Sequence, residues 1–212
     1  MTDTMTMIAE RRRALADRLD ALTPAQWDSP SLCAGWRVRD VLGHLTTPFA
    51  VSVPRLLLVA IRARGFDGAM DRLARERGAR PPTELVAELR ANAEHRFRPP
   101  GLPHEAPLTD VVVHGLDMTV PLGLEPELPG DVARRVLGFV TTPKAARTFG
   151  PGRVLDTLRV EVTDADWSWG DTSAAVLRGP AWAVLLALTG RGAGLDACEG
   201  PGVAALRNGA AR

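Results

Sequence analysis

The feature that most constrains the fold of this 212-residue chain is a change in hydrophobic spacing near residue 150. Through the first 150 residues, apolar side chains recur every three or four positions, as they do within 5–22, and that period is typical of amphipathic helices. After Gly150-Pro151-Gly152 they alternate along 158–162, which is typical of a strand. The sequence therefore predicts a mainly α protein of the α+β class, with a helical domain over 1–150 and a small α+β domain over 151–212.

Proline and glycine residues divide both parts into elements. In the first part, the pattern predicts helices over 5–22, from about 37, over 54–64, from about 83, over 107–121 and over 131–148, the last interrupted at Pro143. Residues 65–80 are rich in Gly and Arg and are expected to form a loop or a frayed turn. In the second part, strands are predicted within 155–162 and at 176–177, with a turn at 166–170 and a helix over 181–188.

The charge balance argues against a nucleic-acid partner. The chain has 26 Lys and Arg residues and 25 Asp and Glu residues, for a net charge of +1, whereas nucleic-acid-binding domains usually carry a basic stripe. The short run Arg11-Arg12-Arg13 is followed by acidic residues, so we expect it to be a solvated helix face.

Composition also indicates a cytoplasmic protein with no membrane partner. The longest apolar stretch, Leu56–Ile61, is far shorter than the roughly 20 residues that span a bilayer. The N-terminus has no apolar segment of the kind found in signal peptides. The two cysteines, Cys33 and Cys198, lie far apart in the sequence, as expected of free thiols in a reducing compartment.

Three residues form the strongest candidate for a chemical site. Asp110 and His114 are four positions apart, so on a helix both side chains project from one face. They could share a metal ion or simply hydrogen-bond to each other. His44 lies in another apolar helical segment and is a candidate third ligand. Two imidazoles and one carboxylate would leave a coordination position open, as in catalytic sites, and this donor set suits zinc, nickel, iron or manganese.

Four further residues could take part in such a site, but each also has a purely structural interpretation. Asp117 could orient His114, and Asp40 could orient His44, although solvated or capping roles explain both carboxylates about as well. Cys33 is a candidate thiol, but a small buried side chain is the simpler interpretation. Arg191 could bind a carboxylate through its guanidinium, or it could form an exposed ion pair.

Several motifs resemble those of a known family. Residues 32–45 (LCAGWRVRDVLGHL) and 110–123 (DVVVHGLDMTVPLG) are similar to the two metal motifs of the mycothiol-dependent maleylpyruvate isomerase family, a branch of the DinB-like metalloenzymes. Residues 162–171, 178–191 and 200–206 resemble the C-terminal domain of that family. These segments occur in the family's order across nearly the whole chain.

The resemblance implies a DinB-like four-helix bundle that holds one divalent metal, and an α+β domain that helps to form a thiol site. His44, Asp110 and His114 match the family's metal ligands, and Arg191 matches a functional arginine that serves catalysis and binding of the thiol cofactor. The family's carboxylate ligand is usually Glu, so Asp110 is one methylene shorter and must approach the metal differently.

The implied activity depends on a divalent metal, zinc first with nickel, iron or manganese as alternatives, and on mycothiol. A metal-bound thiol is readily deprotonated, and the thiolate could add to and leave a double bond or displace a leaving group. The chain would then be an isomerase or a thiol S-transferase acting on a small acidic or electrophilic substrate. A non-catalytic metal- or ligand-binding DinB-like protein and a metal-dependent hydrolase are the alternatives. The sequence leaves open whether the protein is a monomer or a homodimer.

Overall fold

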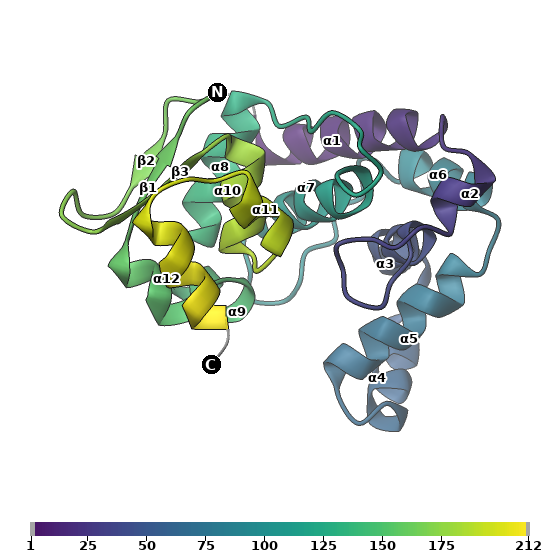
Figure 1. The fold of residues 1–212 in the computed structure, drawn as a ribbon. Coiled ribbons are helices and arrows are strands. Elements are labelled where there is room, and N and C mark those ends of the chain that lie inside the picture. Colours follow the sequence, from purple (N-terminus) through teal and green to yellow (C-terminus); the bar gives the residue numbers. More distant parts are fainter. Residues whose placement is uncertain (1–2, 211–212) are drawn as a thin grey trace. The chain divides into compact units, whose positions relative to one another are not determined.

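The computed structural model describes residues 3–210 and divides the chain into two compact units, Met1–Glu125 and Pro126–Arg212 (Figure 1). Over its described residues, the regular elements of the first unit are all helices. Its elements are α1 (Thr4–Leu19), α2 (Pro24–Trp27), α3 (Val38–Ala50), α4 (Val53–Arg62), α5 (Phe66–Gly78), α6 (Pro82–Ala91) and α7 (Glu105–Thr119).

Four helices enclose the core of the first unit. α1 and α3 each pack against both α6 and α7, and the residues they bury are apolar at helical spacing, among them Ile8, Leu42, Leu89 and Leu108. Local sequence fixes where these helices begin: the Asp3 carboxylate accepts a hydrogen bond from the Met5 amide at the start of α1, and the Asp40 carboxylate accepts one from the Arg37 amide at the start of α3.

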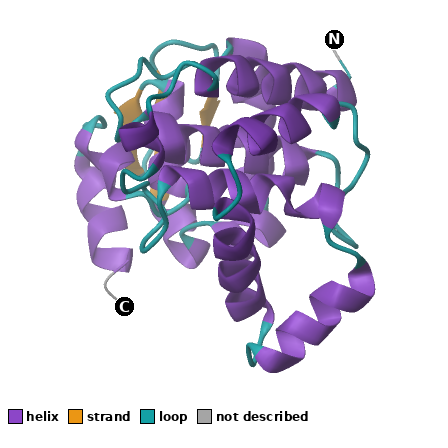
Figure 2. Cartoon of the chain, turned by 90° about the vertical axis from the view of Figure 1, so that its right-hand side faces the viewer, coloured by secondary structure: helices purple, strands orange, loops and turns teal. Residues whose placement is uncertain are grey.

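Most of the segment 65–80, expected to be a loop or a frayed turn, is instead the helix α5, which forms a hairpin with α4 at the lower right of Figure 2. Its Ala69, Leu73 and Ala74 are fully buried at helical spacing. Glycines allow α5 to lie very close to α3: a Cβ at Gly43 would overlap the Ala74 carbonyl oxygen. Packing against α3 therefore outweighs the low helix propensity of the glycines in this segment.

The second unit combines helices with a small sheet. Its elements are α8 (Gly130–Val140), α9 (Pro143–Phe149), the 3-10 helix η1 (Gly152–Thr157), β1 (Leu158–Val162), β2 (Ser168–Trp169), β3 (Ala175–Gly179), α10 (Ala181–Leu188), α11 (Gly192–Asp196) and α12 (Pro201–Ala210). β1 lies in the middle of the sheet, antiparallel to β2 and parallel to β3. The expected turn at 166–170 thus contains a short strand. The parallel pair requires a crossover connection, which the segment 163–174 provides together with β2.

The division between the units differs from the expected boundary at 150. α8 packs against α10 and α9 packs against η1, so residues 130–149 belong to the second unit. Residues 130–149 have the same helical period as the first unit. That period shows that one face is buried, but it does not show which unit buries it. The expected class, mainly α with a small α+β part, is confirmed.

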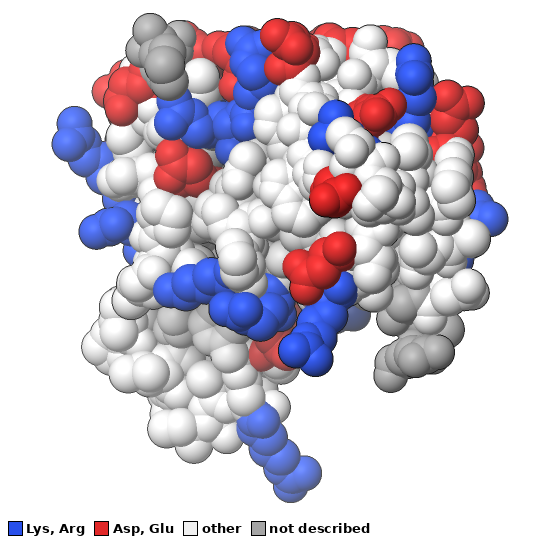
Figure 3. Space-filling model, turned by 90° about the vertical axis from the view of Figure 1, so that its left-hand side faces the viewer, with Lys and Arg blue, Asp and Glu red and all other residues white. Residues whose placement is uncertain are grey.

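Two further expectations concern surfaces. Among the described residues, no helix combines the length and the apolar character needed to cross a membrane. On the face drawn in Figure 3, Lys and Arg side chains occur together with Asp and Glu side chains, and several basic side chains lie side by side below the centre of the view.

Candidate metal centre

The candidate site is built on α7, packed against α3. Asp110, His114 and Asp117 follow one another at intervals of four and three residues, so they share one face of α7. His44 is on α3, and the α3–α7 packing brings its ring to the His114 ring, with centroids 4.8 Å apart. The buried Val111, Val112 and Val113 hold α7 in place between these polar positions.

Three donor atoms converge at this contact. The Nε2 atoms of His44 and His114 lie 3.6 Å and 3.5 Å from the same Asp110 oxygen, Oδ1. One ligand atom from each of the three residues falls within 4.8 Å of the others. The Asp110 side chain is 44% exposed, so the group can be reached from outside. The structure therefore brings together the three residues that the sequence singled out.

The donor spacing fits a shared divalent ion. Two ligands that each lie about 2.1 Å from one ion are about 3.0–3.4 Å apart in octahedral or tetrahedral geometry, close to the observed separations. The Nδ1 atom of His44 is buried and has no hydrogen-bond partner among the described residues. The His44 ring is therefore suited to metal binding through its other nitrogen, Nε2. Although Asp is shorter than Glu, Asp110 Oδ1 lies within 3.6 Å of Nε2 of both histidines.

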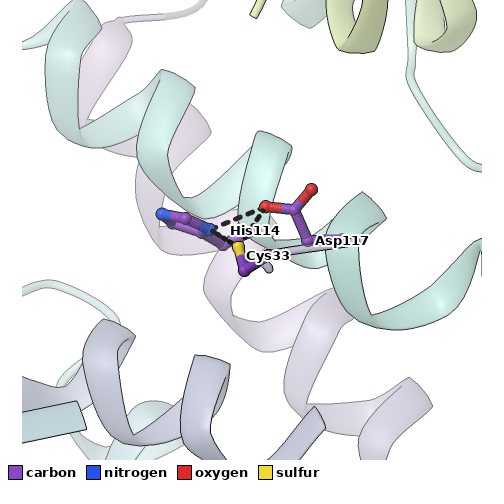
Figure 4. A group of neighbouring side chains, drawn as sticks. All are labelled: Cys33, His114 and Asp117. Carbon is purple, nitrogen blue, oxygen red and sulfur yellow. Dashed lines mark hydrogen bonds and ion pairs between the residues drawn. The ribbon is translucent and has the colours of Figure 1, made fainter. Parts of the chain in front are cut away.

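His114 is held from its other side by a second cluster (Figure 4). Its Nδ1 atom lies 2.8 Å from Oδ2 of Asp117, whose side chain is 0% exposed. The Cys33 thiol donates to the same oxygen at 3.0 Å and lies 3.6 Å from His114 Nδ1. Cys33, His114 and Asp117 also have metal-ligating atoms within 4.8 Å of one another. Since these atoms are already hydrogen-bonded together and Asp117 is buried, the group with His44 and Asp110 is the stronger candidate for a metal site.

The charges around His114 favour its protonated form when no metal is bound. Burial lowers the pKa of His114, but the hydrogen bonds with Asp117 and Cys33 and the charges of Asp110 and Asp117 outweigh it and raise that pKa to about 10. Burial likewise raises the pKa of Asp110, whereas the hydrogen bond with His44 and the nearby positive charges lower it, with a net lowering. Metal binding at Nε2 of His114 therefore has to displace a proton.

One of these positive charges is Arg12, which contradicts the expectation that its run of arginines is a solvated face. Arg12 is buried, and its Nη1 donates to the carbonyl oxygens of Asn92, Ala93 and His95. Its guanidinium lies 5.1 Å from the centre of the Phe49 ring. The helical period predicts that α1 carries charged side chains, but only the tertiary fold decides that Arg12 is the one that faces the core.

The remaining candidates are placed elsewhere. Asp40 is buried but bonds to Arg37 rather than to His44, so the interpretation that it orients His44 is wrong.

The ring that does contact His44 is Trp36. It packs on the His44 ring, with centroids 5.4 Å apart, and donates its Nε1 proton to Asp71. Arg191 belongs to the second unit, at the start of α11, where its Nη1 donates to the Thr189 carbonyl oxygen.

The sequence did not reveal how Cys33 takes part. No periodic signal links it to α7, because it lies in the irregular segment between α2 and α3. What fixes its place is a contact between distant residues: the Leu32 amide donates to the Asp117 carbonyl oxygen at 3.0 Å.

Comparisons with known proteins agree on one family. Residues 8–119 match the family model described as the mycothiol maleylpyruvate isomerase N-terminal domain. Two crystal structures have a similar fold, one titled mycothiol-dependent maleylpyruvate isomerase and the other a histidine-to-alanine mutant of it. Each is 15% identical to the chain, covers 93% of it and 91% of its own length, and gives a TM-score of 0.59. A comparison with curated protein sequences found no match. The chain therefore belongs to the mycothiol maleylpyruvate isomerase family, a family of enzymes.

Proposed function

We propose that the protein is a metal-dependent, mycothiol-dependent enzyme that acts as an isomerase or thiol S-transferase on a small acidic or electrophilic substrate. The observation that carries this proposal is the convergence of His44 Nε2, His114 Nε2 and Asp110 Oδ1 at an accessible point. The names of the family and of the proteins of similar fold include mycothiol and an isomerase reaction; S-transfer is the alternative use of the same thiolate.

In this proposal His44, Asp110 and His114 hold one divalent ion, with zinc the first choice. When bound, such an ion would lower the pKa of a coordinating thiol and polarise a substrate oxygen. The two imidazoles and one carboxylate would leave room for an exogenous ligand. Asp117 and Cys33 keep His114 in place behind the site, and the Trp36 ring packs on His44.

Arg191 is the proposed residue for binding the thiol cofactor and for catalysis. Arg191 is partly exposed, and its guanidinium has the planar donor fork that suits a carboxylate. Substitution of Arg191 by Lys would keep the charge and lose this fork. We expect Arg191→Lys to raise the KM for mycothiol while the metal content stays unchanged.

The metal is tested by elemental analysis of the purified protein. We expect about one divalent ion per chain in the wild type, and a large loss in His114→Ala, because that variant removes one of three ligands. Full metal retention by His114→Ala would contradict the site.

The thiol is tested by comparing turnover of cis-enoyl acids and of electrophiles with and without mycothiol. The proposal expects turnover only when both metal and mycothiol are present. Hydrolysis without any thiol would indicate a metal-dependent hydrolase instead, and metal binding without turnover would indicate a binding protein.

A further inference from the structure

The segment between α2 and α3 contacts α7 at His114 and Asp117. Asp117 accepts two hydrogen bonds from this segment: the backbone bond from the Leu32 amide to the Asp117 carbonyl oxygen, and the side-chain bond from the Cys33 thiol to Asp117 Oδ2 at 3.0 Å. The backbone bond tethers the segment whatever side chain stands at 117. A tether therefore does not explain why a carboxylate is buried there.

Burying a carboxylate is costly unless charged or hydrogen-bonding partners surround it. Oδ2 of Asp117 accepts from the Cys33 thiol and lies 2.8 Å from His114 Nδ1. A carboxylate in this position requires a proton on Nδ1, and the nitrogen left to bind a metal is then Nε2. That is the atom that faces Asp110 and His44.

We infer that Asp117 is a positioning residue that fixes the ring orientation and protonation pattern of His114, and that the Cys33 thiol holds Asp117 in the orientation required. The inference rests on the proposed metal function for its purpose, but the hydrogen bond itself exists with or without metal. Histidine ligands in metal sites commonly donate their other N–H group to a carboxylate, and loss of that partner typically weakens metal binding 10- to 100-fold.

The contrast with His44 sharpens the assignment. Among the described residues, His44 Nδ1 is buried without a hydrogen-bond partner. The Trp36 ring packs on His44, but no carboxylate holds its Nδ1 atom as Asp117 holds that of His114. Of the two histidines, His114 is the one whose metal-binding nitrogen is set by a hydrogen bond.

The test uses Asp117→Asn, which keeps the size of the side chain but offers an amide in place of a carboxylate. Its NH2 group can donate to Nδ1 and so favour a proton on Nε2, the wrong nitrogen for metal binding, as happens when an orienting aspartate of a catalytic histidine is replaced by Asn. We expect the zinc affinity, measured by chelator competition, to fall about 10- to 100-fold.

Asp40→Asn is the matched control. Asp40 is as fully buried as Asp117 but bonds to Arg37. It should lower the unfolding temperature without changing the zinc affinity. Cys33→Ser keeps a donor beside Asp117 and should bind zinc nearly as the wild type does, whereas Cys33→Ala should bind it more weakly.

A second measurement does not depend on metal. Proton NMR of the metal-free, nitrogen-15-labelled protein should show an exchange-protected His114 Nδ1–H resonance in the wild type and in Asp40→Asn, and should lose it in Asp117→Asn. Absence of that resonance from the wild type would overturn the inference, and so would equal zinc affinity in the wild type and Asp117→Asn. A wild type that shows the resonance but binds no zinc would instead refute the proposed function and leave the orientation of His114 established.

Discussion

At the scale of single residues, His114 is the centre of the site because two carboxylates meet its two ring nitrogens. Asp117 lies 2.8 Å from Nδ1 and Asp110 lies 3.5 Å from Nε2. Without metal, a protonated ring satisfies both contacts. When a metal binds, His114 can keep its hydrogen bond with Asp117 but must lose the proton on Nε2, where the metal binds. Two measurable consequences follow, one for the stability of the metal-free protein and one for metal binding.

The first concerns the pH dependence of stability. The pKa of His114 is raised from an ordinary value of 6.5 to about 10 in the folded protein. The stabilisation from its protonated form is therefore complete below about pH 6.5 and is lost as the pH rises through about 10. We expect the free energy of unfolding of metal-free protein, measured with urea, to fall by on the order of 2–4 kcal/mol between pH 6.5 and 10. His114→Gln should flatten this dependence, and an unchanged slope in that variant would refute the assignment.

The second concerns proton release. At pH 7, His114 of the metal-free protein carries a proton on the nitrogen that faces Asp110, so zinc binding should release about one proton per ion. Calorimetric titrations in buffers with different ionisation enthalpies measure that number directly. We expect the release to decrease above pH 10. Zinc binding with no proton release at pH 7 would contradict the raised pKa of His114.

At the scale of elements, the position of α3 depends on its close packing against α5. α3 carries His44, and its Gly43 faces the α5 backbone at Ala74. We expect Gly43→Ala to lower the free energy of unfolding by about 1–3 kcal/mol through overpacking, and to weaken zinc binding because α3 has to shift.

Gly138 on α8 is the comparison, because a Cβ built there meets nothing within 4 Å. Gly138→Ala should raise stability by about 0.5–1 kcal/mol, as expected in an open helical position. Equal effects at the two positions would show that the α3–α5 contact is looser than described.

At the scale of the whole molecule, the chain divides between Glu125 and Pro126 and not near 150. Residues 124–129 have no regular structure, whereas α9 and η1 on either side of Gly150 pack together. A protease of broad specificity should therefore cut first within 121–129, and mass spectrometry of the products identifies the site. A first cut at 150–152 would favour the boundary expected from the change in hydrophobic period.

The sequence by itself determined what depends on local spacing and on family motifs. The helical period puts Asp110 and His114 on one face of α7 wherever that helix lies, and the apolar patterns established the mainly α class with a small α+β part. The motifs at 32–45 and 110–123 identified the family. Tertiary structure decided the rest, because each remaining feature depends on contacts between residues far apart in the chain. These features are the approach of His44 to His114, the burial of Arg12, the contact of Cys33 with Asp117, the helix at 66–78 and the assignment of α8 and α9 to the second unit. Hydrophobic period records which face of an element is buried, but only packing selects the partner that buries it.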